Sequence, residues 1–189
     1  MMTLLSSPHW LGIFYCVSEI ALSLWKRSSS SATNADRGSI RLLWTVIILS
    51  VTASMFVQPA TPWAYSAALH AWRPLWFVLF ALSIVLRWWS ILHLGRFFTV
   101  DVAIAGDQHV VDDGPYRLVR HPSYTGAIGA FLFYGLARAH WLSALILVVP
   151  IAIAFLRRIA IEEAALRDGL GAPYREYCTR TKRLIPFLY

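Results

Sequence analysis

Residues 112–126 read DDGPYRLVRHPSYTG and place charged and aromatic side chains between two apolar stretches. The Gly-Pro pair is a turn signal, and Pro122 suits the first turn of a helix that runs into the next apolar stretch. A helix N-terminus presents free backbone N–H groups and the positive end of the helix dipole. With Arg117, Arg120 and His121 beside it, this segment predicts a site for an anion such as a carboxylate.

Tyr116 and Tyr124, in the same segment, add aromatic faces that can pack on a heterocycle or attract a cation. Arg and Tyr are also the residues that gather where a membrane protein meets the lipid headgroups. The residue types alone therefore leave two interpretations open, a ligand site and an interfacial belt.

A second polar element, RRIAIEEAALRDGL, begins at Arg157 and directly follows an apolar stretch. Arg158 and Glu162 are four residues apart, so on a helix they share one face. Such a pair is also ordinary on a surface helix, where it contributes only about 0.2–0.5 kcal/mol. If this helix lies at the same membrane face as residues 112–126, the two polar elements can meet.

The composition indicates whether the chain lies in a membrane or in water. Of the 189 residues, 58% are hydrophobic and 14% are charged, and the mean hydropathy is +0.56, which favours a membrane protein over a soluble domain with an oversized core. Five apolar stretches predict an all-α integral membrane protein with about five transmembrane helices, namely Trp10–Trp25, Leu42–Val57, Leu75–Leu94, Tyr124–Ala137 and Trp141–Leu156. Only Arg138, Ala139 and His140 separate the last two, which predicts a tight helical hairpin.

The two cysteines, Cys16 and Cys178, lack the spacing of a metal site, so no metal is expected.

The distribution of basic residues predicts how the chain crosses the membrane. With five spans, the segments after the first, third and fifth spans share one side, and together they hold fourteen of the 17 Lys and Arg residues. The positive-inside rule then places the N-terminus outside and the C-terminus in the cytoplasm. The net charge of +7 is accounted for in this way, so no nucleic-acid partner is expected.

The chain is expected to form a single membrane domain over residues 1–189. Residues 1–93 would hold the first three spans, with the Ser-rich residues 26–40 as a flexible linker. Residues 94–189 would form the functional core, including the last two spans and a helical C-terminal tail.

Two ionisable residues, Glu19 and Arg87, fall inside the first and third spans. Charges inside a membrane usually pair or face a polar cavity. Either both border one cavity or each extends separately to the membrane surface, and the sequence leaves their roles open.

Three elements in order, GPYRLVRHPSYTG, RIAIEEAAL and GAPYREYCTRTKRLIP, resemble the isoprenylcysteine carboxyl methyltransferases and the related phospholipid methyltransferases. The resemblance covers the chain from about Leu94 to Pro186, and its LGRFFT stretch is similar to bacterial members. It implies an integral enzyme of the bacterial inner (cytoplasmic) membrane that binds S-adenosylmethionine in a cytosol-facing cavity. The loop between spans three and four, the start of span four and the C-terminal helices would form this cavity, and a lipophilic or lipid-like substrate would enter from the surrounding membrane lipids.

Matched positions in these motifs imply that S-adenosylmethionine is contacted by Gln108, His109, Val110, Val111, Tyr116, His121, Pro122, Ser123, Tyr124 and Glu162. Gln108 stands where the family has a His, so this end of the motif departs from the pattern. Arg158 would be catalytic and would bind the methyl acceptor. The chemistry of the residues agrees, since Glu162 suits a cationic amine or ribose hydroxyls and His121 suits a carboxylate. An acceptor carboxylate is already ionised at neutral pH, so it needs positioning by Arg158 rather than deprotonation.

The expected activity is therefore methyl transfer to a lipophilic acceptor, with a carboxylate as the expected acceptor group and a methyl ester as the product. A phospholipid-type N-methyltransferase, a membrane NADPH-dependent reductase of the sterol type and a non-enzymatic membrane scaffold are the alternatives. The sequence leaves open the identity of the acceptor, the choice between oxygen and nitrogen, and the oligomeric state.

Overall fold

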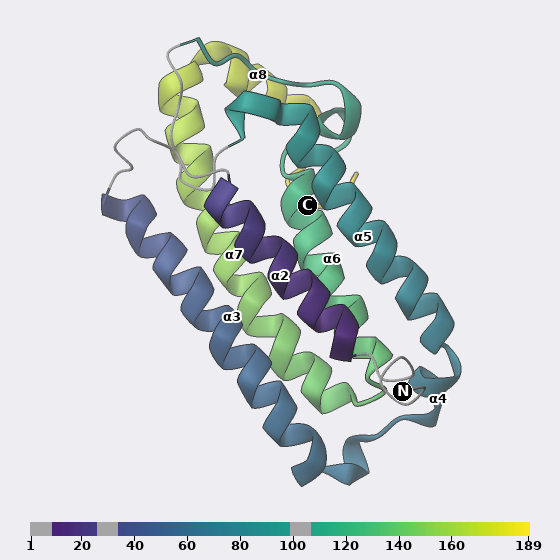
Figure 1. Ribbon diagram of the computed structural model, residues 1–189. Coiled ribbons are helices and arrows are strands. Elements are labelled where there is room, and N and C mark those ends of the chain that lie inside the picture. The colour runs from purple at the N-terminus through teal and green to yellow at the C-terminus, as the bar shows by residue number, and fades with distance from the viewer. Residues whose placement is uncertain (1–8, 26–33, 99–106) are drawn as a thin grey trace.

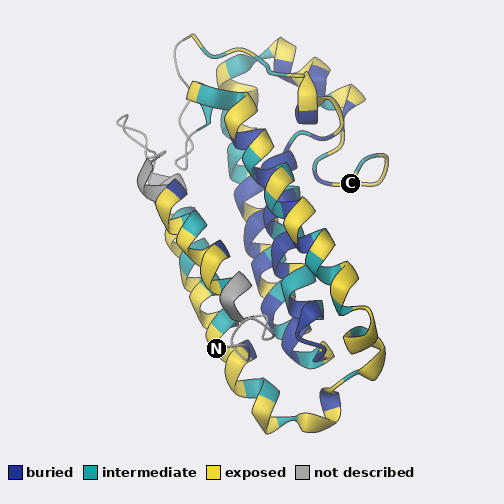
Figure 2. Cartoon of the chain, turned by 45° about the vertical axis from the view of Figure 1, so that its right-hand side comes forward, coloured by how far each residue is buried: buried dark blue, intermediate teal, exposed yellow. Residues whose placement is uncertain are grey.

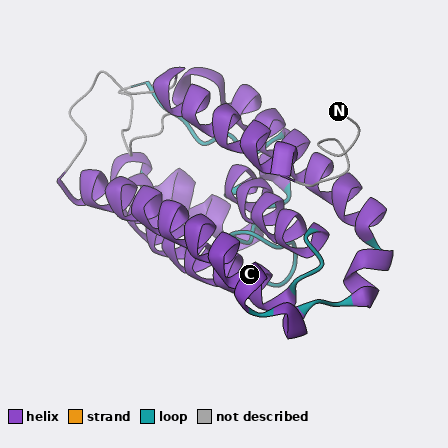
Figure 3. Ribbon diagram, turned by 60° about the horizontal axis from the view of Figure 1, so that its bottom comes forward, coloured by secondary structure: helices purple, strands orange, loops and turns teal. Residues whose placement is uncertain are grey.

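The computed structural model describes residues 9–25, 34–98 and 107–189, and every regular element within these ranges is a helix (Figures 1 and 3). The α-helices are α2 (His9–Trp25), α3 (Asn34–Ala60), α4 (Ala67–Ala71), α5 (Arg73–Leu94), α6 (Pro122–Ala137), α7 (Trp141–Leu170) and α8 (Ala172–Arg180). Three short 3₁₀ segments, η1 (Pro62–Ala64), η2 (Gly95–Phe97) and η3 (Gly114–Arg117), occur between them. The long helices run along one common axis, and α8 lies at one end of the bundle with α4 at the other (Figure 1).

All five predicted apolar stretches are helical, which confirms the expected all-helical fold. Three helical stretches have the length and apolarity to cross a membrane, namely Gly38–Ala60, Arg73–Phe97 and Trp141–Leu170. The helices α2 and α6 are apolar but shorter, with 17 and 16 residues. By length and composition, the described part of the chain thus supplies three candidate spans rather than five.

The predicted flexible linker is wrong at its C-terminal end. Helix α3 begins at Asn34, so residues 34–40 are helical, while residues 26–33 lie outside the described part of the chain. Asn and Asp favour the start of a helix because their side chains can satisfy its first N–H groups. Once started, the helix continues into the apolar stretch without interruption.

Helix α7 carries the second polar element without a break, because it extends from Trp141 to Leu170. Gly171 ends it with a φ of +63°, a conformation that glycine adopts readily, and α8 then follows. At its other end, the connection from α6 consists of three residues, including Ala139 with a φ of 57°, which confirms the predicted hairpin.

Helix α6 lies inside the bundle, where the buried residues are concentrated (Figure 2). Close packing against α5 requires the absence of a side chain at Gly126, because a Cβ atom there would lie 2.6 Å from the carbonyl oxygen of Ser83. The buried core comprises Tyr15, Phe80, Ala127, Ala130, Phe131, Leu147, Ile151 and Phe155. Large apolar side chains such as Phe56 are exposed on the outer faces, as expected where a helix meets lipid.

A buried polar cluster ties the α6–α7 hairpin to α3 at the end of the bundle away from α8. Arg138 Nε donates to Gln58 Oε1 at 2.9 Å, and its Nη1 donates to Ser54 Oγ at 3.0 Å. Ser143 Oγ donates to the carbonyl oxygen of Ser54 at 2.7 Å. The hairpin is therefore anchored at the end of the bundle opposite to the polar segments of the sequence.

Candidate functional site

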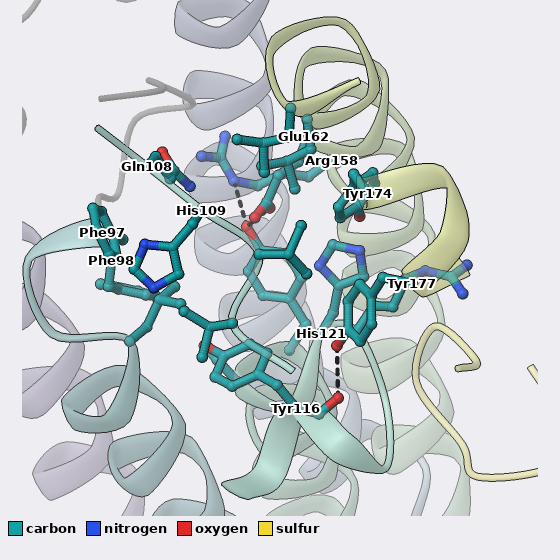
Figure 4. Close-up of a pocket in the computed structure, with 18 residues that line it drawn as sticks. Phe97, Phe98, Gln108, His109, Tyr116, His121, Arg158, Glu162, Tyr174 and Tyr177 are labelled. Carbon is teal, nitrogen blue, oxygen red and sulfur yellow. Dashed lines mark hydrogen bonds between the residues drawn. The ribbon is translucent and has the colours of Figure 1, made fainter. Parts of the chain in front are cut away.

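A cavity opens at the end of the bundle that carries α8, and its empty volume is about 840 Å³ including its open mouth (Figure 4). The end of α5, the segment before η3, the start of α6, the second half of α7 and α8 all contribute to its walls. The structure thus brings together the two polar elements that are far apart in the sequence.

Most of the predicted site residues line this cavity, namely Gln108, His109, Val110, Val111, Tyr116, His121, Ser123, Tyr124, Arg158 and Glu162. Pro122 does not line it, and the prediction of a ligand contact there is not supported by its position. This residue is fully buried in the first turn of α6, where its fixed φ favours the helix start.

A continuous chain of polar groups links α6 and α7 inside the cavity (Figure 4). The hydroxyl of Tyr124 donates to Glu162 Oε2 at 2.7 Å and accepts from Arg158 Nε at 3.2 Å. Arg158 Nη1 also donates to Ser39 Oγ of α3 at 2.9 Å. Arg158 and Glu162, which share one face of α7, are thus joined through Tyr124. Contacts from α6 and α3 fix the orientation of the Arg158 side chain.

The neighbouring carboxylate, Glu163, has a different role because its side chain is completely buried. Arg120 donates to its Oε1 at 2.9 Å, while Arg167 and Arg183 donate to its Oε2 at 2.9 and 3.0 Å. His121 Nε2 lies 3.4 Å from Glu163 Oε1. A buried carboxylate is tolerated when cationic partners satisfy it, so this cluster joins the segment before α6, helix α7 and the C-terminal tail.

The C-terminal tail pairs directly with the segment that precedes α6. The amide of Arg120 donates to the carbonyl of Lys182 at 2.8 Å, and the amide of His121 donates to that of Arg183 at 3.0 Å. Thr125 Oγ1 donates to the carbonyl of Leu184 at 2.7 Å. These bonds hold the cavity wall formed by residues 120–125 against the C-terminal tail.

The predicted anion site at the α6 N-terminus is largely satisfied by the protein itself. Pro122 has no N–H, and the amides of Tyr124 and Thr125 both donate to the carbonyl of His121 at 3.0 Å. Arg120 is committed to Glu163 and to backbone carbonyls, and Arg117 is exposed outside the cavity. Arg120 and His121 still line the cavity, so the expectation that this segment holds a carboxylate stays a prediction.

Several lining residues were not predicted, namely Leu94, Phe97, Phe98, Leu166, Leu170, Tyr174 and Tyr177, while Arg120 was predicted only as part of the anion site. Tyr177 donates to the carbonyl of Tyr116 at 2.6 Å, and Tyr116 donates to that of Ser90 at 3.2 Å. Burial raises the pKa of both phenols well above the ordinary range, so they remain neutral donors. The signal in the sequence was the three-residue spacing of the two tyrosines of α8, which puts both on one helix face.

Among the described residues, three buried side-chain polar atoms have no hydrogen-bond partner, and all three border cavities. Two of them, His121 Nε2 and Tyr174 Oη, belong to residues that line the cavity of Figure 4. His121 Nε2 already faces the Glu163 carboxylate at 3.4 Å, so Tyr174 Oη is the buried atom of this cavity whose hydrogen bond a ligand can complete. The third is the hydroxyl of Tyr15.

A second cavity adjoins the first and has an empty volume of about 690 Å³. Residues of α2, α3, α5, α6 and α7 line it, and most of them are apolar. Phe98, Tyr124 and Arg158 line both cavities, so they form a shared wall. Two ligands, one in each cavity, would meet at this wall.

Glu19 and Arg87 form an ion pair that borders the second cavity, which supports the expectation that both residues border one cavity. Arg87 Nε and Nη2 donate to the two carboxylate oxygens of Glu19. Arg87 Nη1 also donates to the carbonyl oxygen and to Oγ of Ser123, each at 3.1 Å. The pair therefore joins α2 to the first turn of α6.

A model of the isoprenylcysteine carboxyl methyltransferase (ICMT) family matches residues 75–168. Protein-S-isoprenylcysteine O-methyltransferase B of Arabidopsis thaliana is 32% identical over 106 residues, which cover 55% of this chain and 54% of the plant protein. The uncharacterized protein YpbQ of Bacillus subtilis (strain 168) is 23% identical over 130 residues, covering 69% of this chain and 71% of that protein.

Among solved structures, the chain is similar to the eukaryotic intramembrane Ras methyltransferase ICMT, with a TM-score of 0.60 and 25% identity. The similarity covers 77% of this chain and 52% of the eukaryotic one. The chain spans about half the length of the named methyltransferases that it matches.

The helical bundle, its candidate spans and its end-on cavity define a helical membrane protein with the fold of an intramembrane methyltransferase. Over residues 75–168 the chain resembles the isoprenylcysteine carboxyl methyltransferase family.

The two adjacent glutamates separate structural from ligand-directed roles. We expect Glu163→Gln to destabilise the fold by about 3 kcal/mol, because it removes the charge that neutralises the buried Arg120. The matched control Glu162→Gln should change stability far less, since its recorded protein partner is the hydroxyl of Tyr124. Thermal unfolding of both variants in detergent checks this, and equal shifts would contradict the assignment of Glu163 to the fold.

Proposed function

We propose that the protein transfers a methyl group from S-adenosylmethionine to a carboxylate of a lipophilic acceptor in the membrane. The observation that carries this proposal is the wall of Tyr124 and Arg158 shared by two cavities, of which the first has the larger share of polar surface and the second is largely apolar. The similarity to the methyltransferase family over residues 75–168 supports the same reading.

The residues of the first cavity fit S-adenosylmethionine. The carboxylate of Glu162 suits the cationic amine or the ribose hydroxyls, and the unpartnered hydroxyl of Tyr174 suits a further polar group. Phe97, Phe98 and the two valines at 110–111 offer apolar surface to adenine.

When bound, S-adenosylmethionine supplies a methyl group on a sulfonium, and the acceptor oxygen forms the new C–O bond as the C–S bond breaks to leave neutral S-adenosylhomocysteine. The protein's own contribution is alignment, because a carboxylate is ionised at neutral pH and needs no general base. Arg158 is placed for this role at the shared wall, where Tyr124 and Ser39 fix its orientation. Its planar guanidinium can hold one acceptor oxygen while the other faces the donor.

The proposed membrane placement has five spans with the N-terminus outside and the cavity at the cytoplasmic face. The charge distribution supports this orientation, since the end of the bundle carrying α8 also carries most of the basic residues. Helix α6 would span only about 24 Å, which is shorter than the hydrocarbon core of about 30 Å. Its burial among α5 and α7 reconciles this length with a membrane position, because its ends contact protein rather than lipid. Residues 94–189 would then carry the donor site, while α2 and α3 contribute the acceptor side.

A titration with two cofactors tests the proposal against the reductase alternative. Purified protein in detergent should bind S-adenosylmethionine and not NADPH in isothermal calorimetry. Substituting Glu162 or His121 by Ala should weaken donor binding about tenfold or more, because each removes a polar partner. Glu176→Ala on the exposed face of α8 is the matched control and should leave affinity unchanged. Binding of NADPH alone, or unchanged affinity in both cavity variants, would contradict the proposal.

The role of Arg158 is tested by its conservative replacement with lysine. We expect Arg158→Lys to lower the turnover number roughly 10- to 100-fold with little change in donor affinity, since a lysine cannot make the forked contact to a carboxylate. Methyl-transfer kinetics with a tritiated donor and a calorimetric donor titration give the two quantities. An equal loss in both would move Arg158 into the donor site instead.

A further inference from the structure

Residues 185–189 form an apolar loop on the outside of the bundle. The amides of Leu184 and Ile185 both donate to the carbonyl oxygen of Tyr189, at 2.7 and 2.8 Å, and these two bonds close the loop. Within it, Phe187 is 92% exposed and Leu188 is 77% exposed. Figure 2 shows this end of the chain beside the helices, where it projects away from the bundle. The two large side chains therefore face the surroundings of the protein and not its core.

The backbone of Phe187 adopts a strained conformation. Its φ is 67°, which lies in the left-handed region that bulky residues rarely occupy. A glycine or an asparagine would form the same turn at a lower cost in free energy. The fold alone does not explain a large aromatic side chain that is both strained and exposed, so its presence points to a contact outside the protein.

The loop lies level with the boundary between the apolar and the charged parts of the bundle. Thr125 Oγ1, in the first turn of α6, donates to the carbonyl oxygen of Leu184, which directly precedes the loop. The ring of Tyr124, in the same turn, packs 5.3 Å from the ring of Phe155. Phe155 belongs to the last apolar turn of α7 before Arg157. The loop is thus placed where a membrane-spanning helix passes from the hydrocarbon to the lipid headgroups.

The segments around the loop are basic. Residues 177–189 contain three Lys or Arg residues and no Asp or Glu, and residues 114–125, which pair with them, contain two Arg residues and no Asp or Glu. Lys182 and Arg117 are exposed, and Leu118 adds exposed apolar surface beside Arg117. Apolar side chains flanked by cations fit the surface of an anionic bilayer, because the apolar groups enter the acyl region while the cations stay among the phosphates.

We propose that residues 185–189, together with Arg117, Leu118 and Lys182, form a surface anchor that binds the anionic headgroups of the membrane around the protein. The tail that carries this anchor is hydrogen-bonded to the cavity wall at residues 120–125. Attachment to lipid therefore supports that wall from outside the bundle. The inference rests on the position of the bundle in a membrane and is independent of the ligand that the cavity binds.

Quenching by labelled lipids tests the anchor. The full chain, with both cysteines replaced by serine and with Leu188→Cys carrying a fluorophore, is placed in nanodiscs whose lipids bear a nitroxide near the headgroup. The fluorophore should be quenched in discs that contain phosphatidylglycerol, and much less in discs of phosphatidylcholine alone or at high salt. The matched control Glu176→Cys, on the exposed face of α8, should be quenched weakly in both kinds of disc. In the unmodified chain, hydrogen exchange at residues 185–189 should likewise be slower in the anionic discs.

A change of charge tests the part played by the basic residues. Lys182→Ser should weaken attachment in anionic discs about fivefold, the contribution expected of one basic residue near such a surface. The fold should be kept, because the backbone carbonyl of Lys182 makes the bond to Arg120, and thermal unfolding checks this. Equal quenching at positions 176 and 188, or equal quenching in neutral and anionic discs, would overturn the inference. A disulfide formed readily between two copies at position 188 would overturn it as well, since it would assign the loop to a dimer interface.

Discussion

The buried carboxylate of Glu163 is the contact on which the site depends. It lies on α7 and is paired with Arg120 from the segment before α6 and with Arg183 from the C-terminal tail. An ionised group with no solvent exposure is stable only when charged partners stay in place around it, so these contacts hold their segments against α7. The cluster therefore locks together three segments that are far apart in the chain, and the cavity exists because they are locked.

The adjacent Glu162 shows how one helical turn can serve both the fold and a ligand. Successive residues of an α-helix point about 100° apart, so Glu163 faces the arginine cluster while Glu162 faces the cavity. Glu162, Tyr124 and Arg158 then form the hydrogen-bonded chain at the shared wall. Glu162 lines the first cavity alone, whereas Arg158 lines both cavities.

Much of the fold and the site could be predicted from the sequence because the signals are local. The apolar stretches predicted the helices, and the GPYRLVRHPSYTG and RIAIEEAAL motifs predicted most of the lining residues. Contacts between distant residues were missed, since spacing does not show that Glu163 rather than Glu162 would collect the arginines, or that Arg138 would be buried against Ser54 and Gln58. The burial of the short α6 by its neighbouring helices could not be predicted, because hydropathy reports apolar character and not the contacts of a helix.

The central claim is that the two polar elements enclose one binding site for the methyl donor. A cryo-electron microscopy map of the protein bound to S-adenosylhomocysteine tests this most directly. The account predicts ligand density between Glu162, His121 and Tyr174, with its sulfur toward the wall formed by Tyr124 and Arg158. Density at another location, or a map in which α8 and the start of α6 lie apart, would contradict it.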